Sequence, residues 1–242
     1  MGLRVQLLGE FALGSSGETV RLPVGTQRLT AFLALRGPAH RCCVAGTLWP
    51  DVSESQALAS LRTGVWRVNR LFPGLITTDG AGLGIAPGTS VDSRDQEVFA
   101  TRLLRERVED AQWIAERLPV IWCSELLPGW YDDWVLYERE RLNQLRLHAL
   151  DYLAAFMSRR DDLAVALQLA FEAVRIEPLR ETANARLMEV YLAEGNVSDA
   201  VHHYEVVRSL LQRELGLEPS AAVSDLLPAP RVRHRSQATS PP

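Results

Sequence analysis

A repeat of about 34 residues is the sequence feature that most limits how this chain can fold. Ala166 recurs one period later as Ala200, and apolar residues with helical spacing surround both positions. Small residues at such a period are typical of stacked helical hairpins, because a single hairpin cannot bury its apolar face alone. We therefore expect residues 93–217 to be helical, with an array of helix pairs towards the C-terminus.

The spacing inside each period is similar to that of a tetratricopeptide repeat. The matched small, leucine, aromatic and proline positions are Ala166, Ala173, Pro178, Leu187, Tyr191, Ala200 and Tyr204. The match is partial, because Val207 and Gln212 stand where the second repeat would have a small residue and a proline. The sequence predicts helical-repeat architecture with an irregular second repeat.

The N-terminal third changes from strand-like to helical spacing and back. The expected elements are short strands within residues 3–23, helices at 26–37, 44–49 and 53–72, and a hairpin within 75–85. Thr26 is the expected N-cap of the first helix, and Ser53 with Gln56 has the pattern of a capping box. Asp79-Gly80 is typical of a tight hairpin turn. This order of strands, three helices and hairpin predicts a winged helix-turn-helix.

The third of these helices has an apolar face and an arginine-rich face. The apolar positions, three or four residues apart, are Leu58, Leu61, Val65, Val68 and Phe72. The opposite face carries Arg62, Thr63, Trp66, Arg67, Asn69 and Arg70, with no acidic residue among them. Exposed guanidinium groups can contact phosphates or read guanine in the major groove, which makes these six the candidate DNA-binding residues. The alternative is a solvated face whose acidic partners lie on neighbouring elements.

Two details of this candidate interface stay open at the sequence level. Trp66 lies off the apolar positions, so it can either stack on the DNA backbone or cover the hairpin. The expected wing, "TTDGAG" at residues 77–82, contains no arginine. We therefore expect the wing to offer only hydroxyl groups and backbone amides to DNA.

Composition argues against most enzyme classes. All 26 basic residues are arginines, so a P-loop lysine, a Schiff base and a Ser–Lys dyad are excluded. The five histidines lack metalloprotease spacing or a neighbouring nucleophile pattern, and "GAGLG" at residues 80–84 lacks the strand–helix context of a dinucleotide motif. The three cysteines are odd in number and lack CxxC spacing, so we expect small buried residues and no disulfide or zinc site. We expect no enzyme activity and no cofactor or metal.

Charge differs between the two ends of the chain. Residues 1–90 hold 8 arginines against 5 acidic residues, whereas residues 91–227 hold 15 against 25. A mildly basic segment followed by an acidic one suits a nucleic-acid module joined to a protein-binding module, although ordinary variation produces the same pattern.

A second cluster lies in "LLPGWYDDWVLYERERL", residues 126–142. Trp130, Tyr131, Trp134 and Tyr137 lie beside two aspartates, which could form an aromatic ligand pocket. The interpretation we favour is that Asp132 or Asp133 caps a long helix and that the aromatic rings close the packing between helices.

These patterns divide the chain into a DNA-binding domain at residues 1–90, a helical domain at 91–227 and a disordered tail at 228–242. A second capping box, Ser93 with Gln96, is expected where the helical domain begins. The sequence has no signal-peptide pattern and no uninterrupted apolar run of ~18 residues, so we expect a cytoplasmic protein.

The stretches at residues 48–71 and 126–142, followed by tetratricopeptide-like repeats, resemble the Streptomyces antibiotic regulatory protein family. The resemblance extends over about residues 3–227. It implies a winged helix joined to a bacterial transcriptional activation domain. It also implies an activator that binds direct repeats upstream of biosynthetic genes, side by side as a dimer, and recruits RNA polymerase.

The resemblance assigns roles to particular positions. Arg62, Thr63, Arg67 and Arg70 fall where the family's recognition helix meets DNA. Related winged helices touch polymerase at the turn that holds Trp49, Asp51 and Glu54 in this chain. Asn69 and Leu83 depart from the family, since arginine and tyrosine are frequent there. The competing hypothesis is a helical-repeat scaffold or signal-binding protein that does not bind DNA.

Overall fold

The computed structural model describes residues 2–15, 18–80, 82–122 and 124–227. The chain divides into two compact units, Met1–Ala149 and Leu150–Pro242. It is mainly helical with two small sheets, as the sequence predicted. The tail at residues 228–242 lies outside the described residues.

The first sheet contains the N-terminal strands. Its order is β3-β2-β1-β7, with bounds β1 Leu3–Gln6, β2 Ala12–Ser15, β3 Glu18–Thr19 and β7 Ser90–Val91. Val5 pairs with Leu13 across an antiparallel ladder and with Val91 across a parallel one. All three side chains are buried, because residues that pair across neighbouring strands lie on the same face of the sheet.

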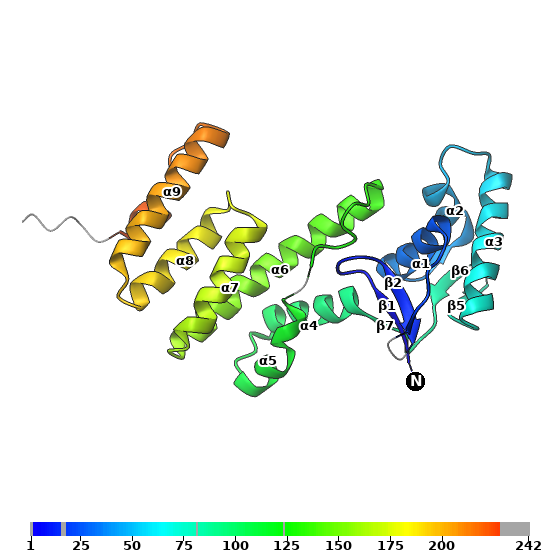
Figure 1. Cartoon of the computed structure of the whole chain (residues 1–242), viewed down its shortest axis with the longest axis horizontal. Coiled ribbons are helices and arrows are strands. Elements are labelled where there is room, and N and C mark those ends of the chain that lie inside the picture. Colours follow the sequence, from blue (N-terminus) through cyan, green and yellow to red (C-terminus); the bar gives the residue numbers. More distant parts are fainter. Residues whose placement is uncertain (1, 16–17, 81, 123, 228–242) are drawn as a thin grey trace, which may run out of the picture. The chain divides into compact units, whose positions relative to one another are not determined.

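The expected winged helix-turn-helix forms next (Figure 1). Its elements are α1 Val24–Arg36, β4 Ala39–His40, α2 Arg41–Leu48, α3 Glu54–Leu71, β5 Ile76–Asp79 and β6 Gly82–Ile85. The strands form a second sheet in the order β4-β6-β5, so the expected hairpin has a third strand at its edge. The Ser53–Gln56 capping box opens α3 as predicted. Thr26, by contrast, lies buried in the first turn of α1, whose N-cap is Pro23.

A close approach between two helices fixes the position of α3. Gly64 is buried, and a Cβ added there would lie 3.0 Å from Cδ2 of Leu29 on α1. A larger residue would push the helices apart. The apolar residues Leu61 and Val68 of α3 are buried on the same side of the helix. The opposite face of α3 is therefore held outward.

The segment after residue 90 belongs to the first unit. It contains α4 Asp92–Glu106, α5 Ala111–Arg117, the 3-10 turn Leu118–Val120 and the start of α6 Asp133–Arg159. The Asp92 carboxylate accepts hydrogen bonds from the backbone amides of Leu7 and Leu8, at 2.8 and 3.1 Å. The compact unit therefore does not end at residue 90, where the sequence placed a domain boundary. The expected Ser93–Gln96 capping box is wrong, since α4 begins at Asp92 with Val91 as its N-cap, and both residues lie buried inside the helix.

The start of α6 contacts α1 at several points. Trp134 packs edge-on against Phe32 at 5.3 Å, and Arg28 forms an ion pair with Asp132. Arg36 pairs with the buried Glu138 at 3.2 Å. These contacts join the winged helix to the segment that follows it in sequence.

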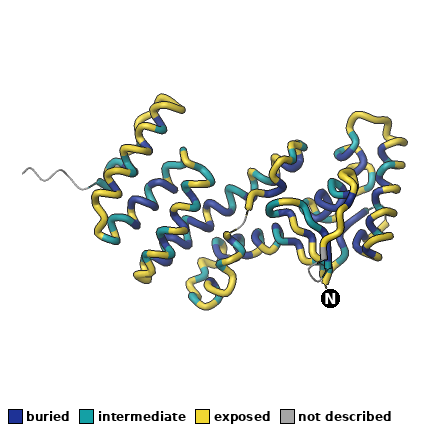
Figure 2. The backbone as a smooth tube through the Cα atoms, in the orientation of Figure 1, coloured by how far each residue is buried: buried dark blue, intermediate teal, exposed yellow. Residues whose placement is uncertain are grey.

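The second unit consists of helices with tetratricopeptide-like spacing. They are the end of α6, α7 Leu163–Ile176, α8 Glu181–Ala193, α9 Val197–Leu215 and the short α10 Ala221–Ser224. Ala166, Ala173, Leu187 and Ala200 are buried where α7, α8 and α9 contact one another. Figure 2 shows buried and exposed residues alternating along these helices. Val207 is also buried, so it fills a repeat position that usually holds a smaller residue.

In the described ranges, no helix is both long enough and apolar enough to cross a lipid bilayer.

Candidate nucleic-acid interface

The outward face of α3 consists of two parallel ridges. Residues four apart lie on the same side of a helix, so Arg62, Trp66 and Arg70 form one ridge. Thr63 and Arg67 form the neighbouring ridge, nearer the start of α1. All five side chains are exposed.

The arginines of this face have no acidic partners. Across the residues that the structure describes, Arg62, Arg67 and Arg70 form no ion pair, whereas Arg102 of α4, Arg141 of α6 and Arg208 of α9 each pair with a glutamate. An exposed arginine without a partner keeps its full charge available for a ligand. The solvated-face alternative required acidic partners on neighbouring elements, and the described residues supply none.

Trp66 both packs and stays accessible. The guanidinium carbon of Arg70 lies 5.1 Å from the centre of its ring, in cation–π contact. The Trp66 side chain is nevertheless 57% exposed. More than half of the Trp66 surface is therefore accessible to a ligand, and the ring stacks with the Arg70 guanidinium.

Asn69 is engaged within the protein. Its Nδ2 donates to the carbonyl oxygen of Ile76 at 2.8 Å, and its Oδ1 accepts from the Ile76 amide at 2.9 Å. Both polar atoms of the side chain are used to tie the end of α3 to the first wing strand. This use of the side chain differs from the DNA contact expected for it, so we leave Asn69 out of the DNA-contacting set.

Arg41 is a cation beside the wing that the sequence analysis missed. One of its guanidinium nitrogens donates to the Thr78 hydroxyl at 3.2 Å, from the first residue of α2 to strand β5. The wing hairpin has no arginine of its own, and Arg41 lies next to it because β4 pairs with β6. The signal available in the sequence was weak: a lone arginine just before a helix of small residues.

A hollow of about 370 Å³ adjoins the Thr63–Arg67 ridge. Three segments form its wall: the start of α1, the end of α2 and the middle of α3. The lining residues are Pro23, Gly25, Thr26, Trp49, Ala59, Ser60, Thr63, Gly64 and Arg67. None of the described residues that line it is acidic.

A second hollow, of about 570 Å³, adjoins the turn between α2 and α3. Trp49 and Asp51 of the predicted polymerase-contacting turn line it, together with Tyr131 and Asp133 from the start of α6. Tyr131 is 78% exposed. Glu54, the third predicted residue, is exposed at the first position of α3.

The aromatic cluster at residues 126–142 divides into two kinds of residue. Trp130 and Trp134 pack inward, Trp130 stacking on Phe11 at 6.2 Å and Trp134 against Phe32. Packing between helices is therefore confirmed for Trp134, whereas Trp130 packs against the segment that precedes β2. Tyr131 and Tyr137 are instead exposed, so only part of the cluster closes the core.

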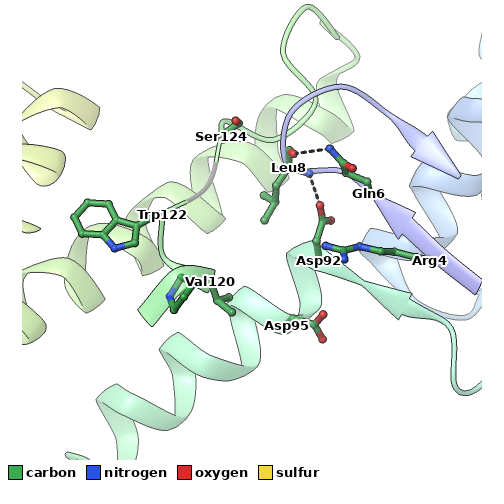
Figure 3. A pocket seen from close by; sticks show the side chains of 9 residues that line it. Arg4, Gln6, Leu8, Asp92, Asp95, Val120, Trp122 and Ser124 are labelled. Carbon is green, nitrogen blue, oxygen red and sulfur yellow. Dashed lines mark hydrogen bonds between the residues drawn. The ribbon is translucent and has the colours of Figure 1, made fainter. Parts of the chain in front are cut away.

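A third hollow lies between β1 and the start of α4 (Figure 3). Arg4 points towards Asp92, which also binds the Leu8 amide. Burial raises the pKa of Asp92 above its ordinary value, and the hydrogen bonds from the amides of Leu7, Leu8 and Ser93, together with Arg4, oppose that rise. The carboxylate is held by the backbone, which is a structural role.

The expectation of buried cysteines is wrong for two of the three. Cys42 and Cys43 are exposed in the first turn of α2. The spacing of these residues is helical, but α2 is short, and the residues that it buries are Val44, Ala45 and Leu48. Cys123 lies outside the described residues.

Comparisons with known proteins match this architecture. Residues 100–229 match the family described as bacterial transcriptional activator domain. The regulatory protein AfsR of Streptomyces coelicolor is 28% identical over 236 residues, covering 93% of this chain and 24% of its own length. AfsR of Streptomyces griseus is also 28% identical, with the same coverage. The chain thus spans about a quarter of the length of these relatives.

A solved structure has a similar fold. Mycobacterium tuberculosis EmbR, determined in complex with a low-affinity phosphopeptide, superimposes with a TM-score of 0.74 at 20% identity. The match covers 93% of this chain and 63% of EmbR. Since the family model covers more than half of the sequence and both AfsR relatives cover nearly all of it, this chain belongs to the Streptomyces antibiotic regulatory protein type of regulators that carry a bacterial transcriptional activator domain.

Proposed function

We propose that this protein is a sequence-specific DNA-binding activator of transcription that acts in the bacterial cytoplasm. The observation that carries the proposal is the face of α3, where Arg62, Arg67 and Arg70 are exposed and have no acidic partner among the described residues. A helix that presents such a face in a winged helix-turn-helix fits the major groove. The neighbouring Thr78 hydroxyl, which accepts from Arg41, can donate to a phosphate, whereas the Thr63 hydroxyl donates to the Ala59 carbonyl at 3.1 Å.

Within this proposal, Arg70 is a base-reading residue. Its contact with Trp66 limits the orientations of the guanidinium, so less side-chain entropy is lost when it binds. An arginine held in this way suits the two acceptors of guanine in the major groove. Arg62, two turns earlier on the same ridge, supports the same groove contact.

The family membership supports the finer parts of the proposal. We propose that the targets are direct repeats in the promoters of biosynthetic genes, and that two copies bind side by side. We also propose that Trp49, Asp51 and Glu54 contact RNA polymerase. We further propose that residues 1–90 carry the DNA-binding function, although the compact unit that contains them extends to Ala149.

The test is selection of genomic fragments by the purified full-length protein at low salt. We expect enrichment of fragments that share a direct repeat, and loss of that enrichment in an Arg62→Ala/Arg70→Ala variant. Arg105→Ala, an exposed arginine on α4, is the charge control and should behave as the wild type. Wild-type protein that enriches no sequence would favour the scaffold hypothesis.

Polymerase contact requires a separate readout. In transcription in vitro from an enriched promoter, Asp51→Ala and Glu54→Ala should lower transcript yield while leaving DNA affinity unchanged. Equal transcript yield from the variants and the wild type would remove these residues from the proposed contact.

A further inference from the structure

The hollow between the start of α1 and the Thr63–Arg67 ridge has the chemistry of an anion site. Gly25 lies in the first turn of α1, where the backbone amides have no carbonyl partner within the helix. The first turn of α1 contains no acidic residue, so the positive end of the helix dipole is not neutralised there. Arg67 brings a full positive charge to the opposite wall.

A buried hydroxyl is the second, independent observation. Thr26 is only 2% exposed and lines the hollow. Its carbonyl oxygen accepts from the Thr30 hydroxyl at 2.9 Å, but its own hydroxyl makes no hydrogen bond to any residue in the described ranges. Because Thr26 lines the hollow, its hydroxyl is available to donate a hydrogen bond to a ligand seated there.

The hollow also lies where a backbone phosphate of bound DNA is expected. Thr63 and Arg67 form the ridge next to the one that carries Arg62, Trp66 and Arg70. A helix seated in the major groove presents its central ridge to the bases and its flanks to the sugar–phosphate walls of the groove. An anion on the flank of α3 is therefore expected to be a backbone phosphate.

We propose that this hollow seats one phosphate of the DNA backbone, held by Arg67, the Thr26 hydroxyl and the Gly25 amide. The proposal rests on the proposed DNA-binding function and deepens it, because it separates two roles on one helix. Arg67 fixes the position of the protein on the duplex, while Arg70 reads sequence. The contact between Gly64 and Leu29 sets the distance between the two walls of the seat.

The first test compares affinity and its salt dependence for specific and random duplexes. Arg67→Ala should weaken both complexes by a similar factor, on the order of tenfold, as expected for loss of a hydrogen bond to a charged group. It should also reduce the slope of log affinity against log salt by about one. Arg70→Ala should instead weaken mainly the specific complex. A loss confined to the specific duplex in Arg67→Ala would overturn the phosphate role.

The second test locates the phosphate. Single phosphates of an enriched duplex are replaced one at a time by uncharged methylphosphonate. Replacement of one particular phosphate in each half-site should weaken binding of the wild-type protein. The same replacement should not weaken binding of Arg67→Ala any further, because that variant has already lost the contact. For Thr26→Val, the loss of affinity on replacing this phosphate should be smaller than for the wild type. For Thr26→Ser, which keeps the hydroxyl, the loss should equal that of the wild type. Additive losses at every phosphate would overturn the seat.

A third measurement separates failure of this inference from failure of DNA binding itself. Inorganic phosphate is titrated into the free protein while amide resonances are followed by NMR. Localised shifts at Gly25 and Thr26, absent in Arg67→Ala, support the seat even if the wild type enriches no DNA, an outcome that would contradict the proposed function alone. Shifts that are absent, or equal in both proteins, would overturn the seat.

Discussion

The Arg70 guanidinium carbon lies 5.1 Å from the centre of the Trp66 ring, one helical turn earlier on the exposed face of α3. Arg70 has no ion-pair partner within the described part of the chain, and Trp66 is 57% exposed. The pair is therefore available to a ligand as a preoriented unit, and its two members can be separated by mutation.

Trp66→Leu should weaken specific DNA binding without removing any charge. Because the platform for Arg70 is lost, we expect a cost of about 0.5–1 kcal/mol, the size of an exposed cation–π contact. Arg70→Ala should cost about 1–3 kcal/mol and relax specificity at one base pair. Fluorescence anisotropy with an enriched duplex and single-base variants measures both. Equal affinities for Trp66→Leu and wild type would show that the stacking does not contribute.

Asn69 should act on the wing through the backbone of Ile76. Asn69→Ala leaves the Ile76 amide and carbonyl without their partner, so we expect the free energy of unfolding to fall by about 1–3 kcal/mol. Faster hydrogen exchange of the Ile76 amide should accompany this loss. Asn69→Arg would introduce the residue frequent in the family, and it should also speed that exchange, since arginine has no acceptor to offer the amide. Unchanged exchange in both variants would contradict the tether.

Glu138 joins α1 to α6 and should stabilise the first unit. It is 4% exposed and accepts from Arg36 at 3.2 Å and from Arg141 at 2.8 Å. Glu138→Gln should lower the free energy of unfolding by about 1.5–3 kcal/mol, because two charge-assisted hydrogen bonds are weakened. All six tryptophans lie between residues 49 and 134, so urea unfolding followed by tryptophan fluorescence reports this unit. Glu140→Gln, on an exposed position of α6, is the control, expected within about 0.5 kcal/mol of wild type.

His203 should make the second unit less stable in mild acid. Burial, with a smaller contribution from His202, lowers the pKa of His203 below its ordinary value. Its Nε2 lies 2.9 Å from Oδ1 of the buried Asn184. As pH falls below about 6.5, the unfolded chain binds a proton that the folded chain resists, so the free energy of unfolding decreases until pH passes the lowered folded value.

The measurement is denaturant unfolding at pH 7.5 and pH 5.5, with hydrogen exchange of α8 and α9 as the local readout. His203→Gln keeps a donor for Asn184 but does not titrate, so its stability should change less between the two pH values. A variant with the same pH dependence as the wild type would assign the effect to other groups.

Much of the fold was predictable because it depends on local patterns. The Ser53–Gln56 capping box, the Asp79-Gly80 turn and the apolar spacing of α3 each require only neighbours in sequence. The repeat alanines, Ala166 and Ala200, were predictable for the same reason, since their period alone requires helices to stack. The exposed arginine face of α3 followed from the same periodicity.

Contacts between distant segments were not predictable in this way. Asp92 binds the end of β1, 84 and 85 residues earlier, and Trp134 packs on Phe32. The first compact unit extends to Ala149, well past the domain boundary at residue 90 that the sequence predicted. No local pattern encodes which of several acidic or aromatic residues meets a given partner.

The sequence by itself determined the order of elements, the helical repeat and which face of α3 carries arginine, because periodicity and turn chemistry are local properties. Tertiary structure decided what each polar residue on that face is for. It tied Asn69 to the Ile76 backbone across the turn into the wing, and it brought Thr26 and Arg67 to one hollow from helices about 40 residues apart in sequence. Hydrogen-bond partners and charge environments arise only when segments distant in sequence are packed together, so those roles follow from the folded molecule.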